Sequence, residues 1–168
     1  YFDDWDNFVN SNPQSTFYHT LRWKEVIEKI YGFDHNYLLY EDSGEIQGIF
    51  PSFRINNLFS GKSQISLPFG SYGGPISIDY KITNKLVKHF VNNHGNEGLD
   101  IRTKNIKLSN FSSINKSYVT SVLDLDSDSS FIWENKLNKK IRNAVRKSKR
   151  SELVFKSNQS YLADFFKL

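Results

Sequence analysis

The sequence predicts a mixed α/β domain in which a twisted, largely antiparallel sheet is flanked by helices. Apolar residues recur at helical spacing over 21–31 and 82–93, and short strand-like runs lie between these two segments, from 36 to 78. Asp42-Ser43-Gly44 separates two of those runs and is a hairpin turn signal. Hydrophobic residues make up 38% and aromatic residues 15% of the 168 residues, which is enough apolar surface for a buried core.

Capping residues and apolar spacing predict the helices. A short amphipathic helix is expected over 3–10. The helix over 21–31 has Thr20 as a plausible N-cap and Gly32 directly after its last residue. Its apolar residues share one face: Trp23, Val26, Ile27 and Ile30. Further helices are predicted over 82–93 and 131–149, and another is expected to begin at Leu162.

Short β-branched and aromatic runs predict the strands. The expected strands cover 36–41, 45–55, 62–67, 76–78, 99–102, 118–125 and 152–156. Pro51 lies inside the second of them and suggests a bulge or an edge position there.

A glycine-rich stretch, 66–76, leaves the strand over 62–67. Gly70, Gly73 and Gly74 are expected to let the backbone adopt positive φ and approach another group closely. Phe69 and Tyr72 are the aromatic residues of this stretch. Such a loop is a common place for backbone amides to meet a ligand, and it is equally consistent with a tight chain reversal that binds nothing.

Positive charge is concentrated in one segment of the chain. The net charge is +4, and eight of the 22 basic residues lie between Lys136 and Arg150. Removing those eight leaves 14 basic against 18 acidic residues, so the rest of the chain is mildly acidic. A helix of this kind suits a polyanion such as RNA or a diphosphate, or anionic lipid head groups; the alternative is a solvated helix. The residues expected to bind a polyanion are Lys136, Lys139, Lys140, Arg142, Arg146 and Lys147.

The composition also excludes several kinds of site. The chain has no cysteine, so it contains no disulfide, no thiolate metal site and no cysteine nucleophile. Its four histidines form no H-E-x-x-H motif, so no metal is expected. G-x-S-x-G and Walker motifs are absent. His19 can line a cleft or act structurally, and Arg102 can clamp a phosphate or carboxylate or form a structural ion pair.

No apolar run approaches the roughly 20 residues of a membrane span, and no signal peptide is visible, so we expect a cytoplasmic location. Because methionine is absent, we expect the chain to be a segment of a longer protein.

The order of these motifs resembles the FemABX family, the aminoacyltransferases that build peptidoglycan cross-bridges. The resemblance rests on the helix with Trp23, the following hairpin, S-L-P-F-x-x-Y-G-G at 66–74, L-x-I-R at 99–102 and the basic helix. It implies a GNAT-like fold, with a first subdomain over 1–127. Residues 128–168 would then begin a second GNAT-like subdomain, and the segment alone would be inactive.

The same resemblance implies transfer of an amino acid from aminoacyl-tRNA, as co-substrate, to an amine of a nucleotide-linked cell-wall precursor, with no other cofactor. It places a substrate cleft beside Trp23, Phe69, Tyr72 and Arg102. Backbone amides of Gly73 and Gly74 are expected to orient the substrate together with Arg102, and no catalytic residue is assigned.

Two other functions stay open. One is an acyl-CoA-dependent GNAT-type N-acyltransferase, although the usual pyrophosphate loop is absent. The other is a non-catalytic module that binds nucleic acid or, as a peripheral contact, anionic membrane through the basic helix.

Overall fold

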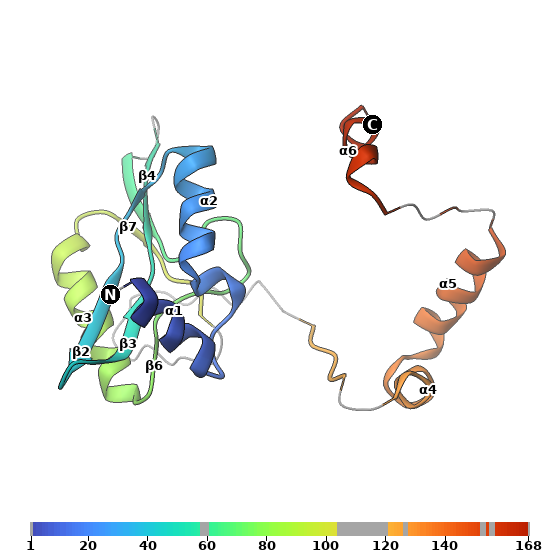
Figure 1. Ribbon diagram of the computed structural model, residues 1–168, viewed down its shortest axis with the longest axis horizontal. Helices are drawn as coiled ribbons and strands as arrows, with labels where there is room; N and C mark the ends of the chain where they lie inside the picture. Colours follow the sequence, from blue (N-terminus) through green and yellow to red (C-terminus); the bar gives the residue numbers. More distant parts are fainter. Residues whose placement is uncertain are drawn as a thin grey trace. The chain divides into compact units, whose positions relative to one another are not determined.

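The computed structural model describes residues 2–57, 61–103, 121–125, 128–151, 154 and 157–167. The chain divides into two compact units, Tyr1–Lys116 and Ser117–Leu168. The first unit contains the β-strands, and the second contains the basic helix (Figure 1). The predicted boundary after residue 127, and the start of a second GNAT-like subdomain beyond it, stay predictions.

The helices of the first unit lie close to their predicted positions. They are α1 (Phe2–Ser11), the 3-10 turn η1 (Phe17–His19), α2 (Leu21–Tyr31) and α3 (Tyr80–His94). The Thr20 side chain accepts a hydrogen bond from the N–H of Trp23, and Gly32 ends α2 in the left-handed conformation with φ +64°. Both caps of α2 are therefore the residues that the sequence indicates.

The strands form two sheets. They are β1 (Asp34–His35), β2 (Leu38–Asp42), β3 (Glu45–Phe50), β4 (Phe53–Asn57), β5 (Gly61–Ile65), β6 (Ile76–Ser77) and β7 (Gly98–Asp100). One sheet has the order β1-β4-β5-β7 and the other has the order β2-β3-β6. The pairings are antiparallel except for the parallel pair β5–β7, so the predicted mixed, largely antiparallel character is confirmed.

The long strand predicted over 45–55 is wrong, because the chain leaves one sheet at Pro51 and enters the other at β4. Proline has no N–H with which to continue a ladder. At the break, the Ser52 carbonyl accepts a hydrogen bond from the N–H of Asn36 at 2.7 Å. The Ser52 hydroxyl donates to the Asn36 carbonyl, also at 2.7 Å. This buried crossover is what produces two sheets.

Strand β3 is buried on both faces. Ile49 and Phe50 are consecutive, so their side chains point to opposite faces of the sheet. Ile49 packs in a cluster with Trp5, Phe8 and Val9 of α1, whereas Phe50 packs in a cluster with residues of α3, including Phe90. Helices α1 and α3 therefore cover opposite faces of the β2-β3-β6 sheet (Figure 1).

The second unit contains a broken helix where the sequence predicts a continuous one over 131–149. Its elements are α4 (Ser129–Phe131), the π-helical η2 (Ile132–Lys136), α5 (Lys139–Arg150), the 3-10 turn η3 (Gln159–Tyr161) and α6 (Leu162–Phe165). The break falls at Leu137 and Asn138, which have extended backbone angles. The Asn138 side chain accepts from the N–H of Ile141 at 2.9 Å and so starts a new helix.

Two predicted strands fall largely outside the described residues. Of 118–125 only 121–125 are described, and they form no strand. Of 152–156 only Val154 is described. Among the helices in the described part of the chain, none is both long and apolar enough to cross a membrane.

Gly48 is the point at which β3 lies closest to α3. A Cβ at this position would lie 2.8 Å from Ile82 Cγ2 and 2.9 Å from Ser77 Cβ. We therefore expect Gly48→Ala to lower the free energy of unfolding by about 1–3 kcal/mol through overpacking. Gly98→Ala is the matched control, because its Cβ would meet nothing closer than 3.4 Å. Equal stability of the two variants in urea unfolding would contradict this packing.

Candidate active-site loop and basic helix

The glycine-rich loop makes close contacts, but it makes them with its own core. A Cβ would lie 2.0 Å from Leu67 Cδ2 at Gly70 and 2.7 Å from the same atom at Gly73. At Gly74 it would lie 2.4 Å from Thr103 Cγ2. The close approach expected of these glycines is confirmed, and the group approached is the buried side chain of Leu67 or the neighbouring Thr103.

The prediction of positive φ at these glycines is wrong. The loop reaches positive φ at Phe69, with φ +61°, and not at Gly70, Gly73 or Gly74. The glycines are required by space, because any side chain would overlap Leu67 or Thr103. The left-handed turn at Phe69 directs its ring outward, and the residue is 61% exposed.

Backbone hydrogen bonds fasten this loop to the segment after β7. The Gly73 N–H donates to the Arg102 carbonyl at 3.0 Å, and the Arg102 N–H donates to the Ser66 hydroxyl at 2.9 Å. The Gly73 amide therefore has a partner inside the protein, and the expectation that it orients a substrate stays a prediction.

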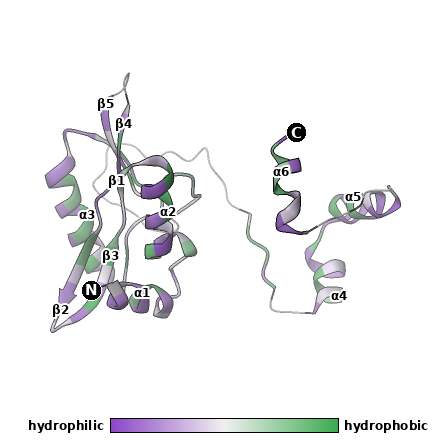
Figure 2. Ribbon diagram, turned by 45° about the horizontal axis from the view of Figure 1, so that its top comes forward, coloured by the Kyte–Doolittle hydropathy of each residue, from purple (hydrophilic) through white to green (hydrophobic). Residues whose placement is uncertain are grey.

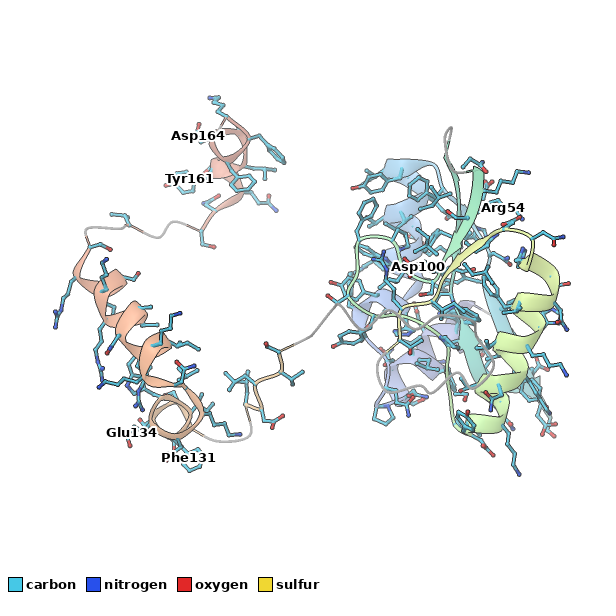
Figure 3. All side chains as sticks on the ribbon, turned by 180° about the vertical axis from the view of Figure 1, so that it is seen from behind. Arg54, Asp100, Phe131, Glu134, Tyr161 and Asp164 are labelled. Carbon is cyan, nitrogen blue, oxygen red and sulfur yellow. The ribbon has the colours of Figure 1, made fainter. Side chains whose placement is uncertain are left out.

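Arg102 itself forms the structural ion pair that the sequence left open. Its Nε and Nη2 donate to Asp100 Oδ2 at 3.0 and 2.8 Å, and its Nη1 donates to the Gly70 carbonyl at 3.2 Å. Asp100 is labelled in Figure 3. Since both side chains are more than one-third exposed, we assign the pair mainly a geometric role, which is to fix the loop against β7.

His19 connects the N-terminal helices to the same loop. It is 1% exposed. Its Nδ1 accepts the Thr16 N–H at 3.0 Å, so Nε2 carries the proton and donates to the Gly74 carbonyl at 3.0 Å. The Trp5 indole N–H in turn donates to the His19 carbonyl at 2.8 Å. Burial lowers the pKa of His19, although its bonds to Gly74 and Thr16 act in the opposite direction.

Trp23, Phe69 and Arg102, predicted to line one cleft, all lie around this loop. Trp23 packs edge-to-face on Tyr18, with ring centroids 5.1 Å apart. A Cβ at Gly70 would lie 3.5 Å from Tyr18 Cγ, so the loop reaches the Trp23 cluster through Tyr18. The Trp23 indole N–H is buried and has no hydrogen-bond partner among the described residues.

On the other side of the loop the exposed rings form a second aromatic group. The Phe69 ring lies 4.5 Å from the Tyr31 ring and 6.5 Å from the Phe33 ring, between centroids. Tyr72 is half-buried in the same loop. The sequence expectation missed Tyr31 and Phe33, because both follow the periodic part of α2 and only the fold brings them to residue 69.

An open hollow of about 420 Å³ adjoins this aromatic group, and no sequence motif indicates it. Its lining comes from the end of α2 and from β1: Glu28, Gly32, Phe33, Asp34 and His35. His35 Nδ1 contacts Glu28 Oε1, and Lys24 Nζ lies 3.0 Å from Glu28 Oε2. Within the described ranges, no group of His, Asp or Glu side chains is arranged to hold a metal ion.

In the basic helix, the six predicted polyanion-binding residues fall into two groups. Arg142 Nη1 donates to the carbonyls of Trp133 and Glu134, at 3.3 and 2.6 Å, and Lys136 Nζ donates to the Asp124 carbonyl at 3.0 Å. The Arg146 guanidinium lies 5.6 Å from the centre of the Trp133 ring. These three cations hold the segment before α5 in place.

The remaining cations of α5 are exposed to solvent. Within residues 128–151, these cations form no ion pair or hydrogen bond with a described side chain. They are Lys139, Lys140, Lys147, Lys149 and Arg150. Helix α5 is mostly hydrophilic (Figure 2). Its large apolar residues, Ile141 and Val145, are four positions apart and form only a narrow stripe. The free positive face of α5 thus includes Lys149 and Arg150 and excludes Lys136, Arg142 and Arg146.

The first unit is thus a mixed α/β fold, in which α1 and α3 cover opposite faces of a sheet and a loop is fastened beside a parallel strand pair. Among solved structures, the chain is similar to the crystal structure of FemX, with a TM-score of 0.62 and 18% sequence identity. The similarity covers 100% of this chain and 47% of the FemX chain, so this chain spans about half the length of FemX. No protein-family model matches the sequence, and no curated protein matches it. The fold implied by the FemABX resemblance is therefore confirmed.

The buried, neutral His19 predicts a pH dependence of stability. Because burial lowers its pKa below the ordinary value of 6.5, the unfolded state binds the proton more readily than the folded state. His19 should therefore make its full contribution to the free energy of unfolding above pH 6.5. Below pH 6.5 this contribution should decrease, by at most about 1.4 kcal/mol per pH unit.

Urea unfolding between pH 7.5 and 5 measures this slope. His19→Gln should make the slope shallower, whereas His89→Gln, on the exposed face of α3, should leave it as in the wild type. A slope unchanged by His19→Gln would show that His19 is not the group responsible.

Proposed function

We propose that this chain is part of a FemAB-like aminoacyltransferase, which moves an amino acid from aminoacyl-tRNA to an amine of a peptidoglycan precursor or a related cell-envelope acceptor. The observation that carries the proposal is the similarity of fold to FemX over the entire chain. The reaction also suits what the described residues contain, because the ester of an aminoacyl-tRNA is already activated. Catalysis then depends mainly on positioning the amine and stabilising the oxyanion.

The glycine loop supports this proposal over an acyl-CoA-dependent enzyme. Holding a pyrophosphate in a loop requires several free backbone amides that point to one place. In this loop the Gly73 amide is bonded to Arg102, and the glycines pack against Leu67 and Thr103. At this loop, Phe69 and its aromatic neighbours present ring surfaces and not a set of backbone amides that could bind an anion.

The full-length protein, incubated with tRNA carrying labelled amino acids and with amine-bearing cell-wall precursors, tests the proposal directly. We expect label on the precursor that disappears when RNase is added at the start. Label that requires acyl-CoA in place of tRNA would identify a GNAT-type N-acyltransferase. Absence of transfer from both donors would overturn the proposed function and leave the fold unaffected.

We further propose that the free positive face of α5 contacts the tRNA backbone. Its cations form two groups, Lys139 and Lys140 at the start and Lys147, Lys149 and Arg150 at the end, about two helical turns (roughly 10.5 Å) apart along a helix of about 18 Å. Duplex RNA offers phosphates on this scale, and each cation–phosphate contact releases counterions. A membrane-surface helix needs a broad apolar face with aromatic residues, whereas α5 has the narrow stripe of Ile141 and Val145.

A charge-matched pair of variants tests this face. Replacing Lys139, Lys140, Lys147 and Arg150 by Gln should weaken tRNA binding, because the phosphate contacts are lost. The slope of log K against log salt should become shallower by about 0.7–0.9 for each contact removed.

The control replaces four exposed lysines of the first unit by Gln: Lys29, Lys62, Lys81 and Lys88. It removes the same charge and should leave the salt slope nearly unchanged. Equal effects of both variants would assign binding to net charge alone, and stronger binding to anionic vesicles than to tRNA would favour a membrane partner.

A further inference from the structure

The hollow at the end of α2 combines three kinds of group. It has an exposed carboxylate, a histidine in contact with a second carboxylate, and an aromatic ring. Gly32, in the left-handed conformation, turns the chain sharply from α2 into β1 and so brings Asp34 and His35 back beside Glu28. The glycine loop approaches the same place, since the Phe33 ring faces Phe69.

Glu28 is held in its charged form. Burial acts to raise its pKa, but hydrogen bonds and charge from Lys24 and His35 prevail and lower the pKa of Glu28. An ionised carboxylate only accepts hydrogen bonds, so the Nδ1 of His35 carries the proton in this contact. In the neutral form of the imidazole, Nε2 is then the nitrogen without a proton, and it has no hydrogen-bond partner in the described part of the chain. A carboxylate that fixes a histidine in this tautomer is the usual arrangement of a general base.

The other charged and titratable groups around His35 leave its outer nitrogen accessible. Tyr37 packs edge-on against it, with ring centroids 5.8 Å apart, and burial together with the Glu28 charge raises the pKa of Tyr37, so it stays neutral. On β4, Phe53 lies opposite His35, and Arg54 lies opposite Asp34. Arg54, which is labelled in Figure 3, instead binds Glu97 of the loop before β7 at 3.1 Å.

Asp34 therefore forms no ion pair with any described cation, and its carboxylate stands at the edge of the hollow. Lys24 balances the charge of Glu28, which leaves Asp34 as the uncompensated charge. The Phe33 ring also lines the hollow, and aromatic rings attract cations. A carboxylate beside an aromatic face selects a positively charged group of small size, and an alkylammonium fits this description.

We propose that this hollow binds the acceptor's amine, with Asp34 and Phe33 attracting its ammonium form and His35, held by Glu28, taking its proton. This inference rests on the proposed function, because the ester donor is the aminoacyl-tRNA. The ammonium first loses one proton to water by way of His35 Nε2. As the amine nitrogen forms its bond to the ester carbonyl carbon, the imidazole takes the second proton. It gives this proton to the ribose oxygen as the carbon–oxygen bond breaks.

Single-turnover transfer by the full-length protein tests the role of His35. General-base assistance is typically worth about 10²–10⁴-fold in rate. We expect His35→Gln to lose at least 100-fold and to lose the acidic limb of the pH–rate profile. Glu28→Gln should also lower the rate, because the imidazole loses the carboxylate that orients it. The control is His89→Gln, an exposed histidine on α3 that contacts Asn93, and it should stay within twofold of the wild type.

A rate loss in His35→Gln with the acidic limb unchanged would indicate only a structural role and overturn the proposal. Full transfer by His35→Gln would overturn it as well, while the transferase function would stand.

A binding measurement separates this inference from the proposed function. The probe is Nα-acetyl-lysine methyl amide, titrated into the full-length protein while the imidazole NMR signals of His35 are followed. We expect saturable shifts in the wild type that weaken at least tenfold in Asp34→Asn. Absence of shifts overturns the amine site whatever the transfer assay shows. Saturable shifts without transfer support the amine site and overturn the proposed transferase function.

Discussion

The buried hydrogen bond between His19 and the Gly74 carbonyl connects parts of the first unit that are far apart in sequence. It spans 55 residues and joins the turn between α1 and α2 to the glycine loop. The Trp5 indole continues this connection into α1, whose other residues pack on β3. The loop is thus fixed by the N-terminal helices at Gly74 and by the segment after β7 at Gly73. Its exposed surface is determined by these internal constraints.

Local signals predicted much of the fold. Thr20 and Gly32 act at the two ends of α2 as their chemistry indicates, because capping depends only on a few neighbouring residues. The hairpin between β2 and β3 turns at Ser43 and Gly44, both with positive φ, for the same reason. The FemABX resemblance supplied the class of fold, which periodicity alone leaves open.

What the sequence did not predict depends on contacts between distant segments. Pro51 signals an irregularity, but the crossover also needs the pairing of Ser52 with Asn36. The break before α5 was hidden, because Leu137 continues the helical apolar spacing while Asn138 competes as a cap. Ile30 was expected on the apolar face of α2, yet it is 66% exposed.

In the candidate site too, local features were predicted from the sequence, whereas contacts between distant segments were not. Phe69 and Arg102 were recognised as notable residues, but their roles are set by partners that only the fold brings near. The sequence left two interpretations open for Arg102, and its hydrogen bonds to Asp100 and to the Gly70 carbonyl favour the structural ion pair. The hollow was missed altogether, since Glu28 and His35 belong to no motif and meet through the turn at Gly32.

The left-handed backbone at Phe69 has a consequence for how this surface can change. The neighbouring glycines are confined by Leu67 and Thr103, so the loop's path tolerates little variation at those positions. The side chain at 69 points away from that packing and meets Tyr31 and Phe33 only at its ring. Asparagine or glycine at this position relieves the backbone and removes the ring without disturbing the core. The identity of the exposed side chain at residue 69 and the stability of the fold are therefore separable within one loop.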